Sequence, residues 1–368
     1  MKQSQEDRNL RHLKTKPRTR KAVLARNIAI LFVSVVFLFA GVACVYAESM
    51  LGRINTVIDE QTAGDNPFQA TSADSEPRDE DPLESGLEEE AGQISDGLKK
   101  VNGLWHDDSI VNLLVMGVDD YQVNDVGRTD SMMLVTIDTR HKQLKVTSFM
   151  RDMYVAIPNN GSQRINVAYS YGGPTLLVST IEANFGIDID RWIVVDFDAF
   201  TEIIDAMGGV DITLTQDEAN LVNRYSGDPR WNLSEGTFTL SGAQARYYSR
   251  IRAIGDDFER TERQRKMFSS LVNKFKGSDI GTINNILANT LNLIQTNMSR
   301  NYILNLASQS LTYLNYDVHQ SRVPGDGNYD ATYVNGMAVL VPDREACSED
   351  LVKFVFGDAD EFEAEQEN

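Results

Sequence analysis

The stretch IVNLLVMGV, residues 110–118, is apolar except for one asparagine and one glycine, and SMMLVTID follows it at residues 131–138. Short runs that are apolar throughout are typical of strands buried on both faces of a sheet. RWIVVDF at residues 191–197 and GVDITL at residues 209–214 have the same β-rich character. Together these runs predict a sheet at the centre of the fold.

Helical patterns alternate with these strands. Apolar residues recur at helical spacing in GPTLLVSTIEANFG (173–186) and in FDAFTEIIDAMGG (197–209). Alternation of strands and helices predicts an α/β fold built in layers. We expect a single α-β-α layered domain with a mixed central sheet over residues 105–357.

Three more helices are expected further along the chain. In LSGAQARYYSRIR (240–252), Ser241 and Gln244 match a capping box, a pair that marks a helix start. Apolar residues at helical spacing predict a helical pair at residues 282–297 and 300–314.

The formal net charge of -19 is unevenly distributed along the chain. Residues 1–26 carry nine Lys and Arg against two acidic residues, whereas residues 48–98 carry two against fourteen. Residues 358–368 carry six acidic residues and no basic one. Most of the net negative charge therefore lies in residues 48–98 and 358–368, outside the predicted domain. This balance argues against a nucleic-acid-binding surface, and we expect no nucleic-acid partner.

Residues 27–47, NIAILFVSVVFLFAGVACVYA, form an uncharged and almost wholly apolar run. At a rise of about 1.5 Å per residue, a helix of this length spans the ~30 Å hydrocarbon core of a bilayer. The run predicts one transmembrane helix, although Val45-Tyr46-Ala47 also resembles a signal-peptide cleavage site. The basic segment 1–26 predicts a cytoplasmic N-terminal tail by the positive-inside rule. The chain would then be a single-pass type II protein of the cell membrane, with everything after the helix outside the cytoplasm.

Two segments are too polar to build a core. Most of residues 48–104 is acidic, rich in Pro, Gly and Ser, and short of branched apolar residues. Such segments cannot bury enough apolar surface to offset the entropy of ordering. We expect residues 48–104 to be a flexible acidic linker and residues 358–368 to be a disordered acidic tail.

The sequence lacks several familiar catalytic signatures, including GxSxG, HExxH, GxxxxGK[ST] and CxxC. Its histidines are scattered: His12, His106, His141 and His319. Any catalysis is therefore expected to rest on carboxylates and guanidiniums.

A polar loop between the first two strands carries candidate metal ligands. Asp119 follows the strand that ends at Val118, and Arg128 and Asp130 stand just before the next strand. Two carboxylates at neighbouring strand ends, with an arginine beside them, suit a Mg²⁺ ion that also binds phosphate oxygens. Loop hydrogen bonds and a surface ion pair would explain the same spacing, so the spacing leaves both interpretations open.

Five arginines gather within YSRIRAIGDDFERTERQRK, residues 248–266, although the chain is acidic: Arg250, Arg252, Arg260, Arg263 and Arg265. Like charges this close repel one another unless an anion lies among them. Planar guanidinium groups suit bidentate binding of phosphate oxygens. Arg151 and Asp152, inside the strand-like run SFMRDMYVAIP, either form an edge-strand ion pair or line a cleft.

The helix expected over FERTERQRKMFSSLVNKF (258–275) places some of these charges on its buried side. Its apolar stripe comprises Phe268, Leu271, Val272 and Phe275. Steps of three and four toward the N-terminus lead from this stripe to Gln264 and Arg260, with Arg263 adjacent. Unpaired charges on a core-facing side would cost several kcal/mol each. Either nearby acidic residues pair these groups, or the groups border a polar cleft that holds an anion.

These stretches together resemble the LytR-CpsA-Psr (LCP) proteins of bacterial cell envelopes. The motifs that carry the resemblance occur in one order: LLVMGVDD, GRTDSMMLVTID, SFMRDMYVAIP, RINVAYSYGG, DFDAFTEIIDAMGGVDI, LSGAQARYYSRIR and DDFERTERQRKMF. The resemblance covers residues 110–276 and reaches residue 357 more loosely. The membrane anchor and extracytoplasmic domain of this family agree with the topology expected here.

The resemblance implies a Mg²⁺-dependent phosphotransferase. Such an enzyme would take a glycopolymer, of the teichoic acid or capsular polysaccharide type, from a polyprenyl diphosphate carrier and attach it to peptidoglycan. Position by position, Asp119 and Asp130 match the carboxylates associated with the metal. The residues that match the diphosphate-binding set are Arg128, Arg151, Arg250, Arg252, Arg260, Arg263 and Gln264. The expected catalytic residues are Arg128, Arg151, Arg250, Arg252 and Asp257.

The resemblance leaves three details open. The loop between Arg252 and Asp257 looks shorter than the usual family form, which leaves the individual roles of Asp256, Asp257 and Arg260 open. The polyprenyl tail would occupy an apolar tunnel between sheet and helices, with TLLVSTI (175–181) as a candidate contributor. Asp152 or Asp257 would accept the proton of the attacking hydroxyl.

Three other functions fit parts of the same pattern. A polyprenyl diphosphate hydrolase would use water in place of the sugar hydroxyl. A membrane-bound transcriptional regulator conflicts with the predicted topology, because the folded domain would face away from the chromosome. A non-catalytic scaffold would only bind wall polymer. The sequence leaves the polymer and the oligomeric state open.

Overall fold

The computed structural model describes residues 55–56, 94–95, 97–118, 127–226, 228, 230–276 and 293–366. The predicted cytoplasmic tail, the predicted transmembrane helix and most of the predicted linker lie outside these ranges, as does Asp119. Within the described ranges, no helix is both long enough and apolar enough to cross a bilayer.

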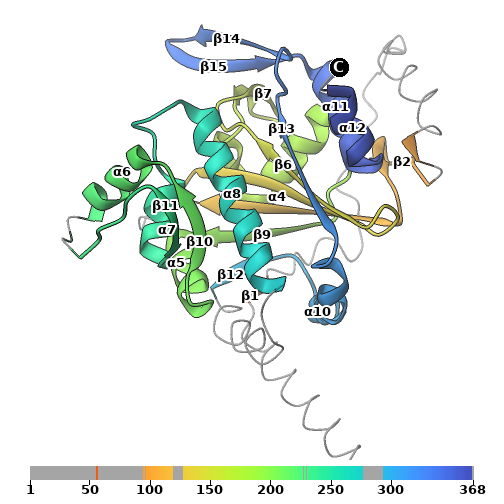
Figure 1. Ribbon diagram of the computed structural model, residues 1–368. Helices are drawn as coiled ribbons and strands as arrows, with labels where there is room; N and C mark the ends of the chain where they lie inside the picture. The colour runs from red at the N-terminus through yellow and green to blue at the C-terminus, as the bar shows by residue number, and fades with distance from the viewer. Residues whose placement is uncertain are drawn as a thin grey trace, which may run out of the picture. The chain divides into compact units, whose positions relative to one another are not determined.

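A seven-stranded sheet forms the centre of the fold, in the order β1-β12-β9-β4-β5-β6-β13 (Figure 1). The strand bounds are β1 Asn55–Thr56, β4 Ile110–Val118, β5 Thr129–Asp138, β6 Gln143–Phe149, β9 Arg191–Asp196, β12 Ile294–Thr296 and β13 Asp317–Val323. β4 pairs parallel with β9 and antiparallel with β5, while β6 pairs antiparallel with β5 and parallel with β13. The predicted α/β fold with a mixed sheet is confirmed.

The pairing brings several polar strand ends to one edge of the sheet. Val118 at the end of β4 is opposite Asp196 at the end of β9, and it is also opposite Thr129 at the start of β5. β6 runs antiparallel to β5, so the end of β6 at Phe149 lies at the same edge. This register places Asp130 and Arg151 near each other, although they come from different strand ends.

Two helices cover one face of the sheet, α4 (Val167–Phe185) and α11 (Arg344–Phe356). Leu177 and Ile181 of α4 and Val352 of α11 are fully buried in one cluster with Leu114 of β4. Apolar burial of this kind is the main favourable term in folding. The segment TLLVSTI, expected as a contributor to the tunnel, therefore packs in this closed core.

The other face carries α5 (Phe197–Ala206), α7 (Gly242–Ser249) and α8 (Asp257–Lys276), which crosses the sheet in Figure 1. The hairpin of β10 (Val210–Leu214) and β11 (Gly236–Leu240) and the helix α6 (Gln216–Ser226) complete this layer. Their buried side chains form a second cluster that includes Ile212, Leu240, Tyr248 and Met267. The layered α-β-α arrangement follows from these two covered faces.

Smaller elements lie around the sheet. Three of them are two-stranded hairpins: β2 (Lys99–Val101) with β3 (Leu104–His106), β7 (Tyr154–Ile157) with β8 (Gly161–Arg164), and β14 (Tyr329–Val334) with β15 (Met337–Pro342). The expected helix near residues 300–314 is α10, Arg300–Tyr313. Residues 294–296, expected to be helical, form β12 instead.

The folded region begins before residue 105, earlier than predicted. Trp105 is buried in the core cluster on the α4 side, and Lys100 lies over its ring at 5.0 Å. Asn55 and Thr56 pair with β12. The linker boundary at residue 104 was therefore placed too late. The hairpin of β2 and β3 is short and mostly polar, so its sequence did not indicate folded structure.

The prediction that residues 358–368 are disordered is wrong for most of this segment. Residues Ala359–Gln366 form the helix α12, which packs against α11 through the rings of Phe362 and Phe354 at 5.4 Å. Ala359 is fully buried, and its N–H donates to Gln143 Oε1. Two apolar anchors thus hold a helix whose other side chains are mostly acidic and solvated.

Candidate active site

An apolar cavity of about 240 Å³ lies between the sheet and the layer of α5, α7 and α8. The sheet contributes Val115, Gly117, Met133 and Val195 to its lining. The helices contribute Phe197, Phe200, Ile203, Met267, Phe268 and Leu271. Phe268 and Leu271 belong to the apolar stripe predicted for α8, so part of this stripe faces the cavity, while Val272 packs in a separate cluster with Ile137 and Leu144.

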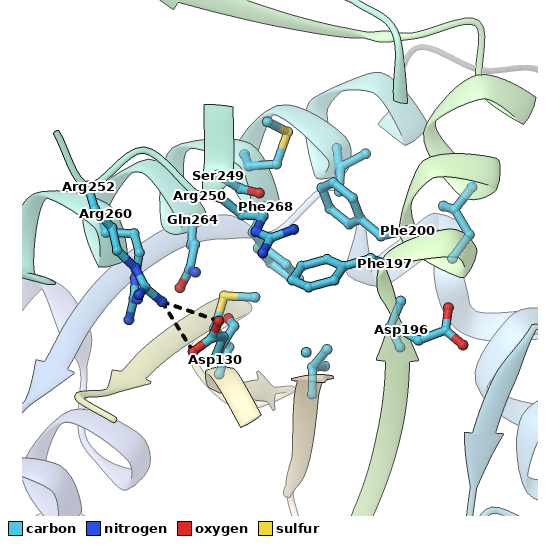
Figure 2. Close-up of a pocket in the computed structure, with 18 residues that line it drawn as sticks. Asp130, Asp196, Phe197, Phe200, Ser249, Arg250, Arg252, Arg260, Gln264 and Phe268 are labelled. Carbon is cyan, nitrogen blue, oxygen red and sulfur yellow. Dashed lines mark hydrogen bonds and ion pairs between the residues drawn. The ribbon is translucent and has the colours of Figure 1, made fainter. Parts of the chain in front are cut away.

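Polar side chains occupy one end of the same cavity. Figure 2 shows Arg252, Arg260 and Gln264 beside Asp130, and Arg250 next to the ring of Phe197. The cavity is therefore amphiphilic. Its inner part is lined by apolar side chains. Its polar end, called the mouth of the cavity below, carries guanidinium groups around the carboxylate of Asp130.

Asp130 is the carboxylate at the centre of this group. Arg151 NH1 donates to its Oδ1 at 2.7 Å, and Arg252 NH2 lies 3.3 Å from its Oδ2. Burial lowers the pKa of Arg151, but the carboxylates of Asp257, Asp130 and Asp152 outweigh burial and raise it overall. Arg151 therefore stays charged while it links two parts of the site.

Asp257, the first residue of α8, is the second carboxylate of the site. Arg260 NH2 lies 2.6 Å from its Oδ1, and Arg151 Nε lies 3.3 Å from the same atom. Burial raises the pKa of Asp257, against the lowering effect of the two arginines. Its other oxygen, Oδ2, is buried and has no hydrogen-bond partner among the described residues.

Arg260 shows most clearly what the site lacks. Its side chain is 2% exposed, and one of its three nitrogens, NH2, is bonded to Asp257. Within the described part of the chain, Nε and NH1 are buried without a hydrogen-bond partner. Burial lowers the pKa of this guanidinium, against the effect of Asp257, which raises it. A buried donor left without an acceptor costs about 1–3 kcal/mol, and more when it is charged, so this arginine is poised for an anion.

Arg250 is oriented by the helix before it and by an aromatic ring. α7 begins with a capping box, in which the Ser241 side chain accepts from the Gln244 N–H and the Gln244 side chain accepts from the Ser241 N–H. The predicted cap is confirmed. Arg250 is the C-terminal cap residue of α7, and its guanidinium lies 4.4 Å from the centre of the Phe197 ring. Arginine over an aromatic face is favourable and holds the guanidinium at the cavity wall.

Arg263 does not join the other arginines. Its Nε donates to Glu218 of α6 at 2.8 Å, and its NH1 and NH2 donate to the carbonyls of Ile251 and Ile254. The side chain is 7% exposed and connects α8 to α6 and to the loop before α8. The geometry therefore gives Arg263 a structural role, and the prediction that it binds a diphosphate is not supported.

The structure gives mixed outcomes for the remaining predicted residues. Arg128 is exposed and stands two residues before Asp130 at the start of β5. Gln264 lines the cavity as expected from the α8 stripe. Asp119 lies outside the described residues, so the predicted pairing of Asp119 with Asp130 stays a prediction.

Two features of the site were missed by sequence reasoning. The apolar wall comes from α5, and its only signal was the apolar set within FDAFTEIIDAMGG. Arg164 NH1 lies 3.3 Å from Asp152 Oδ1 and adds a further cation beside the group around Arg151. Nothing in the local sequence around Arg164 signalled this contact.

An apolar cavity that ends in a group of guanidiniums, of which that of Arg260 is buried, has a shape and charge that suit an amphiphile with an anionic head. The sequence pattern of the LytR_cpsA_psr family matches residues 71–351, which is more than half of the chain. The chain therefore belongs to the LytR_cpsA_psr family.

Two curated relatives and one solved structure illustrate the similarity. The polyisoprenyl-teichoic acid--peptidoglycan teichoic acid transferase TagU of Oceanobacillus iheyensis is 31% identical over 245 residues, covering 62% of this chain and 74% of that protein. The regulatory protein MsrR of Staphylococcus aureus is 36% identical over 173 residues, covering 46% of this chain and 50% of that one. A LytR-CPS2A-psr family protein, YwtF (TagT), with bound octaprenyl pyrophosphate lipid shares the fold with a TM-score of 0.53 at 23% identity, over 70% of this chain and 93% of that one.

Proposed function

We propose that this chain is a Mg²⁺-dependent phosphotransferase that moves a glycopolymer from a polyprenyl diphosphate carrier to peptidoglycan. The observation that carries the proposal is Arg260: a buried guanidinium with two nitrogens that lack an acceptor in the described residues, at the mouth of an apolar cavity. The names of TagU and of the lipid-bound TagT support the same substrate class. The polymer would be of the teichoic acid or capsular polysaccharide type.

The two ends of the cavity suit the two ends of such a carrier. The apolar wall of α5, α8 and the sheet would take the first isoprene units. Arg151, Arg250, Arg252 and Arg260, with Gln264, would bind the diphosphate, and Arg128 would approach it from the exposed strand end. Guanidinium groups bind phosphate oxygens in bidentate geometry, so their number here matches a dianionic or trianionic head.

The proposal places a Mg²⁺ ion at the mouth of the cavity. Asp130 supplies carboxylate oxygens at the cavity lining, which are the hard ligands that Mg²⁺ prefers. We propose that Asp130 and Asp119 hold the ion, which would neutralise charge on the phosphate oxygens.

The proposed transfer forms one P–O bond and breaks another. The hydroxyl oxygen of the acceptor sugar attacks the phosphorus nearest the donor sugar, and the bond from that phosphorus to the bridging oxygen breaks. Polyprenyl phosphate leaves, and Arg252 and Arg260 stabilise its charge. Asp257 accepts the hydroxyl proton, because burial raises its pKa and its Oδ2 has no partner within the described ranges. Transfer of this kind needs positioned charge and no protein nucleophile.

The proposal also includes the location. Residues 27–47 would anchor the chain in the cell membrane, with the N-terminus in the cytoplasm and the folded domain outside it. The envelope substrates of the named transferase relatives agree with this placement. A reporter fused to the C-terminus should therefore be active outside the cytoplasm.

The experiment uses the full-length protein in liposomes with a lipid-linked polymer and peptidoglycan. Wild type should attach polymer to peptidoglycan, whereas Asp130→Asn and Arg151→Ala should each abolish attachment and leave the melting temperature nearly unchanged. Arg344→Ala, at an exposed arginine of α11, is the matched control. Unchanged turnover in either site variant would contradict the assignment. Free phosphorylated polymer without attachment would instead indicate a polyprenyl diphosphate hydrolase.

A further inference from the structure

We propose that Tyr225 and Tyr247 form an aromatic platform that binds the sugar ring nearest the diphosphate of the lipid-linked substrate. This inference rests on the proposed function, because it extends the same site by one subsite. It assigns a carbohydrate-binding role to residues outside the arginine group.

A second cavity, of about 390 Å³, adjoins the apolar one. Its lining is Asp130, Tyr225, Tyr247, Arg250 and Arg252. Asp130, Arg250 and Arg252 line both cavities, so the two spaces meet at the polar group. The two cavities have opposite character beyond that junction: the first is walled by aliphatic and phenyl side chains, and the second by tyrosines.

The rings of the two tyrosines stack on each other, and Tyr225 is the more exposed of the two. Their rings are nearly parallel, 9° apart, with centroids separated by 5.8 Å. Trp231 meets the Tyr247 ring edge-on, at 5.7 Å and 70°, and fixes it from the side. The platform is therefore held by packing before any ligand arrives.

The exposure of the aromatic side chains indicates which of them is available to bind a ligand. Tyr247 and Trp231 pack against the cluster beneath α6 and α7, which accounts for their positions. Tyr225 is 43% exposed, and its ring adjoins a cavity that contains charged groups. Most tyrosine rings are at least partly buried, so a ring exposed to water lacks that favourable burial. Exposed tyrosines are frequent at sites that bind a partner with both apolar and polar surface.

A pyranose ring has that mixed surface. Its C–H faces are apolar and pack on aromatic rings, while its hydroxyl groups at the edge bond to charged side chains. The second cavity offers both: tyrosine rings, and the charged groups of Asp130, Arg250 and Arg252. The order along the site is apolar cavity, arginines, tyrosines. A polyprenyl diphosphate sugar presents its tail, diphosphate and sugar in the same order.

The test compares two ligands that differ only in the sugar. One is farnesyl diphosphate, and the other is farnesyl diphosphate linked to N-acetylglucosamine. In wild type the sugar should increase affinity. Tyr225→Ala should remove most of that gain and weaken the sugar-bearing ligand by about threefold to tenfold, while binding of farnesyl diphosphate changes less than twofold. Tyr225→Phe keeps the ring and should bind the sugar-bearing ligand as wild type does.

Tyr247→Ala should act in the same direction as Tyr225→Ala, and its melting temperature reports any loss of packing. Tyr333→Ala is the matched control, because Tyr333 is an exposed tyrosine of β14, a strand that contributes no residue to either cavity. Equal weakening of both ligands, or no weakening of either, would overturn the platform while leaving the diphosphate site standing. If wild type bound neither ligand, the proposed function would fail together with the platform.

One further arm distinguishes the donor sugar from the acceptor sugar. In the transfer assay, Tyr225→Ala should raise the KM for the lipid-linked donor and leave the KM for peptidoglycan within twofold. A rise confined to the peptidoglycan KM would assign the platform to the acceptor and overturn the proposal.

Discussion

Arg260 and Arg263 lie less than one turn apart on α8 and are both buried, yet their surroundings are opposite. Arg263 uses all three of its nitrogens within the protein, on Glu218 and on two backbone carbonyls. Arg260 uses one, and its Nε and NH1 meet no acceptor in the described structure. Proteins rarely leave a buried charged donor unpaired, so the difference separates an arginine that holds the fold from one kept for a ligand.

The largest expected effect is on activity at Arg260. Arg260→Met keeps the unbranched stem of the side chain and removes the charged guanidinium group. It should slow transfer by roughly 10³- to 10⁵-fold, as loss of a transition-state arginine does in phosphoryl transfer. Stability should change little, because Arg151 Nε still lies 3.3 Å from the Asp257 oxygen that Arg260 leaves, and the substitution removes two unpaired buried nitrogens. Single-turnover transfer and thermal unfolding of the same preparation measure both quantities. A variant that keeps its transfer rate would contradict the comparison.

Arg263→Met should have the opposite profile. It leaves Glu218 buried without its cation, which should lower the free energy of unfolding by about 3–5 kcal/mol. Adding Glu218→Leu should recover at least half of this loss, since an apolar pair can replace a buried ion pair. Urea unfolding measures the stability of both variants. The double variant, once folded, should retain transfer within about threefold of wild type. Arg263 would be a ligand residue if the stable double variant had lost transfer.

The sequence predicted more of the site than its local composition suggests. The apolar stripe of α8 correctly placed Arg260 and Gln264 on the buried side, because residues three and four apart share a helix face. The sequence did not reveal the ion pair of Arg263, because its partner Glu218 is 45 positions away and belongs to another helix. No pattern within one helix shows which of two neighbouring arginines meets a distant carboxylate.

The strands and the layered architecture were also predictable from the sequence. The apolar runs at residues 110–118 and 131–138 predicted strands, and the alternation of strands with helices predicted an α/β fold in layers. The face that holds the cavity was not predictable: α4 and α5 have comparable apolar patterns, yet α4 closes one face while α5 lines a cavity on the other. That choice depends on the path of the chain between strands. The helix α12 was not predicted because its segment is mostly acidic. The contact between Phe362 and Phe354 of α11 that stabilises it does not show in the local sequence.

Glu182 of α4, on the opposite face of the sheet, is a half-buried carboxylate that is close to the carboxylates of Asp188 and Asp190. Burial, together with Asp188 and Asp190, raises its pKa to about 7. A raised pKa means that its contribution to stability is complete below its ordinary value of 4.5 and is lost as pH rises through about 7. Between pH 5 and pH 8 the free energy of unfolding should fall by roughly 2 kcal/mol more in wild type than in Glu182→Gln.

The control for this titration is His106, whose Nδ1 lies 2.8 Å from Asp188 Oδ2. His106→Gln, made in both backgrounds, separates the contribution of the imidazole from that of Glu182. Urea unfolding across the pH range gives all four curves. Parallel curves for wild type and Glu182→Gln would contradict the raised pKa.

The smallest effect is expected at the N-terminal cap of α7. Ser241→Ala removes the side-chain acceptor for the Gln244 N–H and should lower the free energy of unfolding by about 1 kcal/mol. Because Arg250 is also held by the Phe197 ring, transfer should change less than about twofold. A large loss of transfer without a loss of stability would show that the cap, rather than the ring, positions Arg250.

The central claim is that the two nitrogens of Arg260 without a partner are kept for a diphosphate. Calorimetric titration of farnesyl diphosphate into the full-length protein tests it most directly, with Arg260→Met and the folded Glu218→Leu/Arg263→Met variant alongside. The account predicts that Arg260→Met weakens binding by at least about thirtyfold, whereas the double variant binds within about threefold of wild type. Wild-type affinity in Arg260→Met, or an equal loss in the double variant, would contradict it.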